Sequence, residues 1–445
     1  MLKTFSIGGV HPQENKLSAH QPIIKAEVPA KAVILLGQHI GAPAKPIVAK
    51  GDVVKVGTKI AEPGGFVSAA IHSSVSGKVA KIDTIVDASG YPKPAIFIDV
   101  EGDEWEESID RSETLVKECT LSSEEIVKKI ADAGIVGMGG ACFPTQVKLC
   151  PPPAFKAECV IINAVECEPY LTADHQLMLE HAEEIVVGVT ILMKAVKVNK
   201  AFIGIENNKP DAVQLMTKVV SSYPGIEIVP LKVKYPQGGE KQLIDAIIQR
   251  QVAAGALPIS TGAVVQNVGT AFAVYQAVQK NKPLFERVIT VTGKSLAKPS
   301  NFMARVGTPM RQLIEACGGL PEDTGKVIGG GPMMGKALVN IDVPTAKGSS
   351  GVLIMDRKEA KRGEIQNCIR CAKCVGACPM GLEPYLLSAL AENTEFERME
   401  TERIMDCIEC GSCQFTCPAN RPLLDYCRLG KGKVGAMIRA RQAKK

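Results

Sequence analysis

The sequence is poor in aromatic residues and has no long apolar run. Aromatic side chains make up 4% of its 445 residues, with a single Trp. The longest apolar candidate, IVVGVTILM from Ile185, lies between Glu184 and Lys194 and falls short of the ~18 residues that a membrane-spanning helix needs. The N-terminus, MLKTFSIGG, lacks the apolar core of a secretory signal. We therefore expect no transmembrane span and a cytosolic location.

Histidine is also rare, and the net charge is small. All six histidines lie at or before His181, and the net charge of +5 is too small by itself to indicate nucleic-acid binding. The last residues, 431–445, form a basic tail. We expect this tail to be a solvated terminus, and the alternative is docking on an acidic partner or an anionic membrane face. Its basic residues are Lys431, Lys433, Arg439, Arg441, Lys444 and Lys445.

Cysteine, in contrast, is abundant, and eight of the fifteen cysteines form two copies of one motif. CIRCAKCVGACP begins at Cys368, and CIECGSCQFTCP begins at Cys407. Each copy reads C-x2-C-x2-C-x3-C-P, the ferredoxin pattern in which three thiolates hold one cubane and the fourth crosses to the other. We predict two [4Fe-4S] clusters. One is held by Cys368, Cys371, Cys374 and Cys417, and the other by Cys407, Cys410, Cys413 and Cys378.

A zinc site is the alternative, but it favours paired CxxC motifs, often with histidine, and this region has no histidine. The spacer between the motifs carries Leu382, Tyr385, Leu386 and Ala389 at helical spacing, which predicts a helical two-cluster module. The roles of the remaining cysteines are left open. They are Cys119, Cys142, Cys150, Cys159, Cys167, Cys317 and Cys427.

A glycine-rich loop, GIVGMGGACFPTQVK, occupies residues 134–148. It follows LSSEEIVKKIADA, which predicts a helix opened by a capping box of Ser122 and Glu125. A dinucleotide fingerprint would instead follow a strand. Glycines at this density let backbone N–H groups approach an anion or a flat ring, although a tight turn is the alternative.

Downstream, strands alternate with helices. Residues 159–165, 200–206 and 226–233 read as strands, and residues 173–196 and 210–222 between them read as helices. This order predicts a parallel sheet with ligands beyond the carboxyl ends of its strands. The loops there offer hydroxyl- and phosphate-binding groups, although each carboxylate alone reads as a solvated surface charge. These groups are Lys148, Asn163, Glu166, Glu168, Gly238, Gly239 and Glu240.

Four motifs, GMGGACFPTQVK, NAVECEPY, YPQGGEKQL and VVQNVGT, resemble in the same order the flavin loops of the NADH-oxidising 51-kDa subunit of respiratory complex I. The resemblance departs at Met138, Val165 and Gly239, where that family has Arg, Asp and Glu. It implies NADH contacts from Phe143, Glu168 and Glu240. It also implies FMN near Gly137, Gly139, Gly140, Lys148, Asn163, Glu166, Gly238 and Asn267.

The flanking segments predict smaller modules. Residues 48–79 resemble lipoyl and biotinyl carrier domains but lack a modifiable lysine in IHSSVSG, and His39 and His72 are expected to be packing or surface residues. Residues 286–320 resemble a soluble-ligand-binding β-grasp module, with Thr308 as the expected cap of a helix beginning at Pro309. A second glycine loop, KVIGGGPMMGKAL at residues 326–338, is expected to be a turn.

The resulting order is an α/β multidomain chain. The predicted domains are a lipoyl-like β barrel-sandwich (1–115), an FMN/NADH-binding α/β domain (120–275), the β-grasp module (276–350), an α-helical two-[4Fe-4S] ferredoxin module (360–430) and the basic tail (431–445). With the opening GGVHP, this order resembles the C subunits of Rnf complexes, the ion-pumping ferredoxin:NAD+ oxidoreductases of bacterial membranes.

The resemblance implies hydride exchange between NAD(H) and FMN and single-electron relay through two clusters. It also implies a peripheral position on the cytoplasmic face of the cell membrane, among other Rnf subunits and in indirect contact with ferredoxin. Two alternatives remain open. One is a cobalamin reductase of a propanediol-type microcompartment, and the other is a non-catalytic scaffold like the A subunit of the sodium-pumping quinone reductase.

Overall fold

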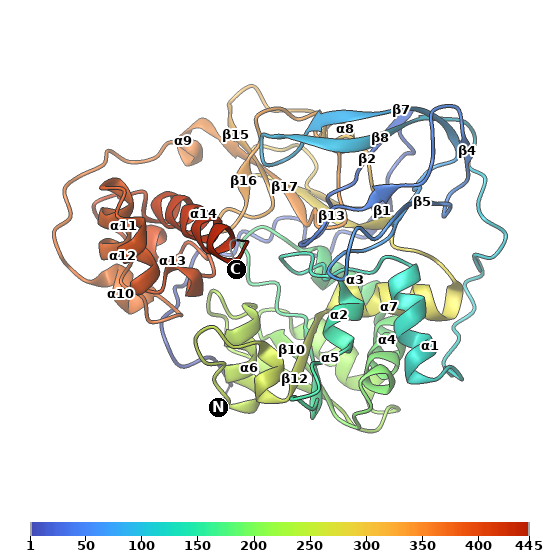
Figure 1. The fold of residues 1–445 in the computed structure, drawn as a ribbon, viewed down its shortest axis with the longest axis horizontal. Helices are drawn as coiled ribbons and strands as arrows, with labels where there is room; N and C mark the ends of the chain where they lie inside the picture. Colours follow the sequence, from blue (N-terminus) through green and yellow to red (C-terminus); the bar gives the residue numbers. More distant parts are fainter. Residues whose placement is uncertain (1, 444–445) are drawn as a thin grey trace.

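The computed structural model describes residues 2–443 and arranges them around four β-sheets and a separate group of helices (Figure 1). Two small antiparallel sheets lie near the N-terminus, a parallel sheet lies in the middle of the chain, and a mixed sheet follows it. The C-terminal helices stand to one side of these sheets in Figure 1. The fold is the α/β multidomain class that the sequence predicts.

The N-terminal barrel-sandwich packs two sheets on each other. Its core consists of β-branched and small side chains such as Ile34, Ile60, Ile71 and Ile96, all fully buried, as the short strands between glycines predict. The sheets have the orders β2-β8-β7-β4 and β3-β5-β6. Their strands are β2 Lys31–Leu35, β3 Lys45–Pro46, β4 Val53–Val54, β5 Lys59–Glu62, β6 Ile71–His72, β7 Gly77–Val86 and β8 Pro92–Val100.

The flavin-like domain is built on a parallel sheet of order β11-β10-β9-β12, which confirms the predicted topology. Helix α6 covers one face, and α4 and α7 cover the other, and the inner strands are buried along almost their whole length as expected for a sheet covered on both faces. The strands are β9 Cys159–Asn163, β10 Ala201–Glu206, β11 Ile226–Leu231 and β12 Ala263–Asn267. The helices are α1 Ser123–Asp132, α2 Thr145–Leu149, α3 Ala173–Glu180, α4 Ala182–Ala195, α5 Pro210–Val220, α6 Glu240–Ile248, the 3-10 helix Pro258–Thr261 and α7 Val268–Lys280.

Local signals predicted some helix boundaries and missed others. The capping box of Ser122 and Glu125 is present at the start of α1, as predicted. The single helix expected over residues 173–196 is wrong, because the backbone leaves helical geometry at His181, where φ is −128° and ψ is 35°. The His181 ring then bonds to Glu184 at 3.0 Å, one turn into the second helix.

The third unit is a six-stranded mixed sheet of order β1-β14-β13-β17-β15-β16. Its edge strand, β1, comes from the N-terminal region and pairs in parallel with β14. Helix α8 begins one residue later than expected, with Pro309 rather than Thr308 at the N-cap. The elements are β1 Ile23–Lys25, β13 Glu286–Thr292, β14 Ser300–Arg305, α8 Met310–Ala316, β15 Thr324–Gly329, β16 Lys336–Ala337 and β17 Gly351–Asp356.

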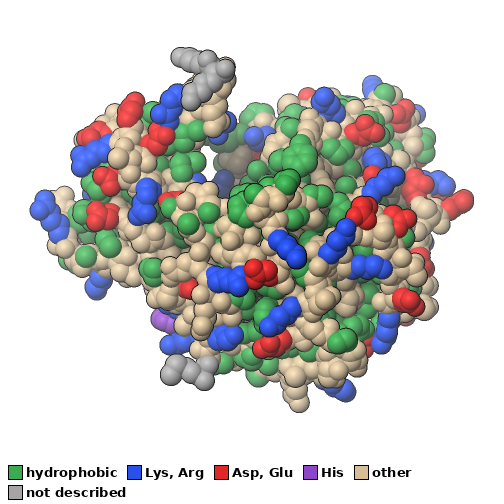
Figure 2. All heavy atoms as spheres, turned by 60° about the horizontal axis from the view of Figure 1, so that its bottom comes forward, with side chains coloured by type: hydrophobic (Ala, Val, Ile, Leu, Met, Phe, Trp, Pro, Cys, Tyr) green, Lys and Arg blue, Asp and Glu red, His purple; other side chains and the backbone are tan. Residues whose placement is uncertain are grey.

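The C-terminal module is helical, as the spacer between the cysteine motifs predicts. The residues expected to form a basic tail continue helix α14 as far as Gln442, and only Lys444 and Lys445 of that tail lie outside the described residues. On the face shown in Figure 2, charges of both signs are interspersed. The elements are α9 Arg357–Ala360, α10 Lys373–Ala377, α11 Pro384–Glu392, α12 Phe396–Thr401, the 3-10 helix Ile404–Asp406, α13 Ser412–Phe415 and α14 Leu423–Gln442.

Candidate flavin and iron–sulfur sites

The predicted flavin residues gather where the parallel sheet reverses its strand order. The chain places β10 and β11 on one side of β9 and returns to place β12 on the other, so a crevice is expected between the carboxyl ends of β9 and β12. Asn163 and Asn267 end these two strands and are direct register partners. The side-chain amide of Asn163 donates to the carbonyl of Gly238 at 2.8 Å, which joins a third predicted loop to this edge.

The glycine-rich loop lies against this crevice. Its base is closed by a hydrogen bond from Gly137 N to Phe143 O at 2.9 Å. A Cβ added to Gly139 would lie 3.0 Å from the side chain of Asn267, so the loop contacts the start of α7. A Cβ added to Gly140 would meet no atom within 4 Å, and both glycines are exposed. The loop therefore presents bare backbone to open space beside Asn267.

Glu166 shapes the loop that follows β9. Its backbone is left-handed, with φ of +48°, and its carboxylate accepts hydrogen bonds from Asp174 N at 2.8 Å and His175 N at 3.2 Å at the start of α3. Asp174 in turn accepts a 2.7 Å bond from the amide of Asn267. Burial, together with the nearby Glu166 carboxylate, raises the pKa of Asp174 to about 7. A polar network thus underlies the crevice.

Lys148 and Glu240 form an ion pair of 2.7 Å between α2 and the start of α6. The ammonium of Lys148 also donates to Val265 O at 3.1 Å, next to the end of β12. Phe143 is half-buried in the glycine loop. Met138, at the position where the related family has arginine, is buried and donates its backbone N–H to Thr270 at 3.0 Å. Its side chain therefore adds no charge to the crevice.

Glu168 has partners that its sequence context did not reveal. Its carboxylate accepts hydrogen bonds from Met333 N at 3.2 Å and Met334 N at 2.6 Å, and an added Cβ on Gly331 would collide with it. Burial raises the pKa of Glu168 to about 7. The second glycine loop, which was expected to be only a turn, therefore also binds the Glu168 carboxylate through its backbone N–H groups. A direct contact of Glu168 with NADH stays a prediction.

These residues fit a bound flavin nucleotide in three respects. The glycine loop offers space that any side chain at residue 140 would occupy. Helix α7 is thirteen residues long and starts at the crevice, where its N-terminus favours an anion such as a phosphate. Lys148 supplies a nearby cation. The predicted loops therefore supply the groups that could hold the flavin.

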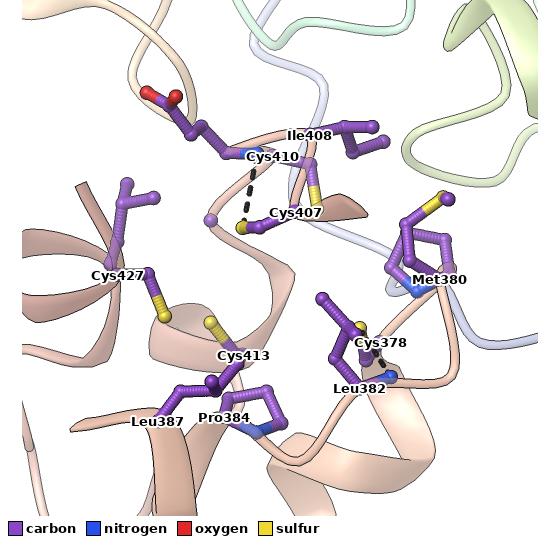
Figure 3. A pocket seen from close by; sticks show the side chains of 14 residues that line it. Cys378, Met380, Leu382, Pro384, Leu387, Cys407, Ile408, Cys410, Cys413 and Cys427 are labelled. Carbon is purple, nitrogen blue, oxygen red and sulfur yellow. Dashed lines mark hydrogen bonds between the residues drawn. The ribbon is translucent and has the colours of Figure 1, made fainter. Parts of the chain in front are cut away.

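The second predicted set of cluster ligands lines one cavity. Cys378 from the first motif lies there with Cys407, Cys410 and Cys413 from the second, and Leu382, Pro384 and Leu387 form its apolar wall (Figure 3). The backbone N–H of Leu382 donates to the sulfur of Cys378 at 3.4 Å, and the backbone N–H of Glu409 donates to the sulfur of Cys407 at the same distance. Hydrogen bonds of this kind tune cluster potentials. The assignment of Cys378 to the cluster of the second motif stays a prediction, and it is supported because Cys378 shares a cavity with the three other predicted ligands.

Cys427 on α14 lines the same cavity, and sequence spacing gave no sign of it. Its thiol lowers the pKa of Cys407 through a hydrogen bond, which favours the thiolate that binds iron. Within residues 2–443, no three His, Cys, Asp or Glu side chains converge closely enough to hold one metal ion.

The first predicted set of cluster ligands is more exposed to solvent than the second. Cys368 and Cys371 are exposed, on an exposed run of residues that extends from 361 to 373, while Cys374 is buried and Cys417 is partly buried. Cys417 lies close enough to raise the pKa of Cys374, although burial is the main cause of that rise. Figure 1 shows this run on the side of the helical module away from the parallel sheet. We refer to the first set as the outer cluster site and to the second set as the inner cluster site.

The inner cluster site contacts the flavin-like domain directly. The hydroxyl of Tyr235, in the loop after β11, donates to the carbonyl of Cys410 at 2.8 Å. Gln242 of α6 donates to Pro379 O at 3.2 Å, one residue beyond Cys378. Val10, Tyr235, Met333, Ala377 and Cys410 form a small shared apolar core. Two of the predicted inner ligands therefore belong to the domain interface.

Four family descriptions match the chain in order. They are the RnfC barrel sandwich hybrid domain (residues 3–103), the Nuo51 FMN-binding domain (130–276), the SLBB domain (288–337) and the 4Fe-4S dicluster domain (367–421). The chain is 47% identical to the C subunit of the proton-translocating ferredoxin:NAD(+) oxidoreductase complex of Clostridium ljungdahlii, over 100% of this chain and 97% of the relative. The chain belongs to the RnfC family, the C subunits of Rnf complexes.

Other relatives agree. The chain is 44% identical to the C subunit of the Na(+)-translocating ferredoxin:NAD(+) oxidoreductase complex of Acetobacterium woodii, over 97% of each chain. It is 42% identical to the C subunit of the ion-translocating oxidoreductase complex of Rhodobacter capsulatus, over 97% of this chain and 84% of the relative. An NAD+-reducing [NiFe]-hydrogenase in the H2-reduced state shares the fold, with a TM-score of 0.50 at 18% identity over 70% of this chain and 63% of that one.

The domain matches support FMN and two [4Fe-4S] clusters as the cofactors of this RnfC family member. Other subunits of an oxidoreductase complex are its expected partners. Among residues 2–443, none of the helices combines the length and apolar character needed to cross a membrane.

Proposed function

We propose that this chain exchanges a hydride between NAD(H) and FMN and passes single electrons through two [4Fe-4S] clusters. The names of its relatives support ferredoxin:NAD+ oxidoreduction by a complex that translocates ions. The observation that carries the proposal is the bond from Tyr235 to Cys410, which joins a predicted flavin loop to a predicted cluster ligand. FMN would convert between the two-electron chemistry of nicotinamide and the one-electron chemistry of the clusters.

The residues have distinct tasks in this proposal. Asn163, Asn267 and the bare backbone at Gly139 and Gly140 orient the flavin, and Lys148 balances its phosphate. The remaining predicted FMN contacts are Gly137, Glu166 and Gly238. The nicotinamide nucleotide approaches from the side of Phe143 and Glu240. Glu168, whose carboxylate is bound to the second glycine loop, lies near this approach. No side-chain acid or base is required, because a hydride transfer moves no separate proton at the protein.

The arrangement also suggests an order of electron carriers. The inner cluster site touches the flavin-like domain, and the outer site lies on an exposed run. The inner cluster would therefore exchange electrons with the flavin, and the outer cluster with a partner subunit. In the direction that the relatives' names suggest, electrons from reduced ferredoxin reach the outer cluster through other subunits and leave as NADH.

The same relatives suggest where the chain works. We place it as a peripheral subunit on the cytoplasmic face of the cell membrane, where NAD(H) and ferredoxin are available, and assign ion movement to other subunits of the complex. Co-purification of membrane subunits with this chain supports this placement. Co-purification of a corrinoid enzyme instead would support the cobalamin reductase alternative.

Anaerobic reconstitution with iron, sulfide and FMN tests the proposed chemistry. We expect one FMN and about eight iron atoms per chain, the content of two cubanes, with NADH-dependent reduction of an artificial one-electron acceptor. Tightly bound zinc in place of iron, or NADH oxidation at an undiminished rate without FMN, would contradict the proposal. A chain that binds both clusters but no flavin would instead support the scaffold alternative.

A further inference from the structure

The N-terminal segment, residues 3–18, lies on the flavin-like domain rather than in the barrel-sandwich. Lys3 forms a parallel bridge with Leu231 at the end of β11, and Val10 forms an antiparallel bridge with Tyr235 in the loop beyond it. Both backbone bonds of the second bridge are short, at 2.8 and 2.9 Å. The segment thus runs along the carboxyl edge of the parallel sheet. We call it the N-terminal strap.

Lys16 of the strap binds the loop that follows β9. Its ammonium donates to the carbonyls of Glu166 at 2.8 Å, Glu168 at 2.9 Å and Leu171 at 2.7 Å. A lysine ammonium has three N–H donors, so every donor of Lys16 is used on this one loop. Loss of water around the ammonium lowers the pKa of Lys16. The strap adds a fourth bond to this loop, because Tyr170 N donates to Glu14 O at 2.8 Å.

The loop needs such support because its backbone is strained. Glu166 and Tyr170 both have left-handed backbones, with φ of +48° and +70°. A non-glycine residue in this region costs about 1 kcal/mol or more and persists only where its surroundings hold it. Glu166 is also the residue whose carboxylate fixes the start of α3 beneath the crevice. Lys16 therefore acts on the geometry of the predicted flavin site without lying in the sheet that forms it.

A cavity of about 210 Å³ adjoins this contact, lined among others by His11, Glu14, Lys16, Cys167 and Glu206. A polar cavity of this size admits several water molecules. Water could therefore replace the ammonium if Lys16 were shortened. The three carbonyls would keep partners, and the expected consequence is a looser loop rather than an unfolded domain.

The middle of the strap touches the inner cluster site. Gly9 N donates to Ala377 O at 3.0 Å, directly before Cys378. Gly8 has a left-handed φ of +69°, and an added Cβ would lie 2.5 Å from the backbone carbonyl of Cys378. Only a glycine permits this approach. The strap therefore contacts a flavin loop with its C-terminal end and the peptide of a predicted cluster ligand with its middle.

We infer that Lys16 is a positioning residue for the flavin loop, and that the N-terminal strap fixes this loop relative to the inner cluster. The inference rests on the proposed function, since it assigns a role to residues outside the flavin motifs. It goes further because it gives two parts of the strap, at Gly8 and at Lys16, separable tasks. Loss of Lys16 should affect flavin binding, and a change at Gly8 should affect the inner cluster.

The test compares Lys16→Met with Lys234→Met in anaerobically reconstituted full-length chain. Lys234 donates a single hydrogen bond from its ammonium to Phe5 O at 3.1 Å, so the control loosens the same strap away from the loop of residues 166–171 that Lys16 binds. For Lys16→Met we expect the FMN dissociation constant to rise about tenfold to hundredfold, because the loop that orients the flavin loses three hydrogen bonds. The flavin midpoint potential should also shift, while iron content and the inner-cluster EPR signal stay unchanged. Lys234→Met should keep wild-type FMN affinity.

Two further variants guard the test. Lys16→Arg keeps the charge, but its planar donors cannot reach three converging carbonyls, so FMN affinity should fall between wild type and Lys16→Met. Gly8→Ala should alter the inner-cluster EPR signal and leave FMN affinity within about twofold.

The outcomes separate the inference from the proposed function. Wild-type FMN affinity and potential in both Lys16 variants would overturn the inference alone. Equal loss of FMN, iron and folded protein in both variants would also overturn it, because Lys16 would then be a general structural residue. Failure of the wild-type chain to bind FMN would overturn the proposed function, and the inference with it.

Discussion

The hydroxyl of Tyr235 donates a 2.8 Å hydrogen bond to the backbone carbonyl of Cys410, across the interface between the parallel-sheet domain and the helical module. The ring of Tyr235 is buried, and burial keeps its pKa well above the usual value, so the hydroxyl stays protonated and able to donate at neutral pH. Together with the bond from Gln242 to Pro379 O, this hydrogen bond fixes the relative orientation of the two domains more than it adds affinity.

Tyr235→Phe should therefore change the rate of electron transfer more than the cofactor content of the protein. The variant leaves the Cys410 carbonyl without its partner, which we expect to cost about 1 kcal/mol of stability. FMN and iron contents should match wild type, while the inner-cluster potential shifts and its reduction by NADH slows. EPR-monitored redox titration and rapid-mixing absorbance measure both. Tyr223→Phe is the matched control, since that hydroxyl bonds to Glu183 at 3.1 Å within the parallel-sheet domain. Identical behaviour of the two variants would contradict the prediction.

Gly140→Ala tests where the flavin lies. Because an added Cβ would meet no protein atom within 4 Å, the substitution should leave the flavin-free chain as stable as wild type. If FMN occupies the open space beside the loop, its affinity should fall about tenfold through steric conflict. Equilibrium dialysis and thermal unfolding give the two readings. Gly432→Ala, on α14, also has open space around its Cβ; it should leave FMN affinity unchanged and raise the unfolding temperature slightly, because alanine is favoured over glycine within a helix.

The crossed ligand assignment predicts which cysteines act together. Cys378→Ala should abolish the same EPR signal as Cys410→Ala, although these residues come from different motifs, and Cys417→Ala should abolish the other signal together with Cys371→Ala. Each variant should retain about four iron atoms per chain. If Cys378→Ala behaved like Cys371→Ala instead, each motif would hold its own cluster and the crossing would be wrong.

The sequence was informative where the chemistry is local. The spacing of the eight cysteines predicts their grouping because ligands of one cubane must lie within a few residues or at a defined crossing. The alternation of strands and helices predicts the parallel sheet and places Asn163 at its carboxyl edge, while Asn267 was placed near the flavin only by the family resemblance. The capping box at Ser122 is equally local.

What the sequence could not reveal depends on contacts between distant residues. Lys16 reaches carbonyls 150 to 155 positions away, and no pattern near Lys16 marks them. Gly331 looked like part of a turn, but its environment is the carboxylate of Glu168, which comes from another domain. Cys427 lies outside both motifs and joins the inner cavity only because α14 packs there. Each case requires the tertiary structure.

Lys347 gives a prediction for pH. Its ammonium lies at a junction of three units and donates to Ala70 O and Gly134 O, both at 2.7 Å. Burial lowers the pKa of Lys347 from 10.5 to about 7. Between these two values the unfolded chain binds a proton that the folded chain does not, so the contribution of this residue to stability rises with pH and is lost as pH falls toward 7.

Lys347→Met removes that titration and leaves two buried carbonyls without a donor. We expect the melting temperature of the variant to lie below that of wild type, and the gap to widen between pH 7 and pH 9 because only wild type gains stability over that interval. Differential scanning fluorimetry on anaerobic protein at both pH values measures the gap. Lys298→Met, which replaces an exposed lysine in the same domain, should follow the wild-type pH dependence. Parallel curves for wild type and Lys347→Met would show that Lys347 keeps its proton when folded.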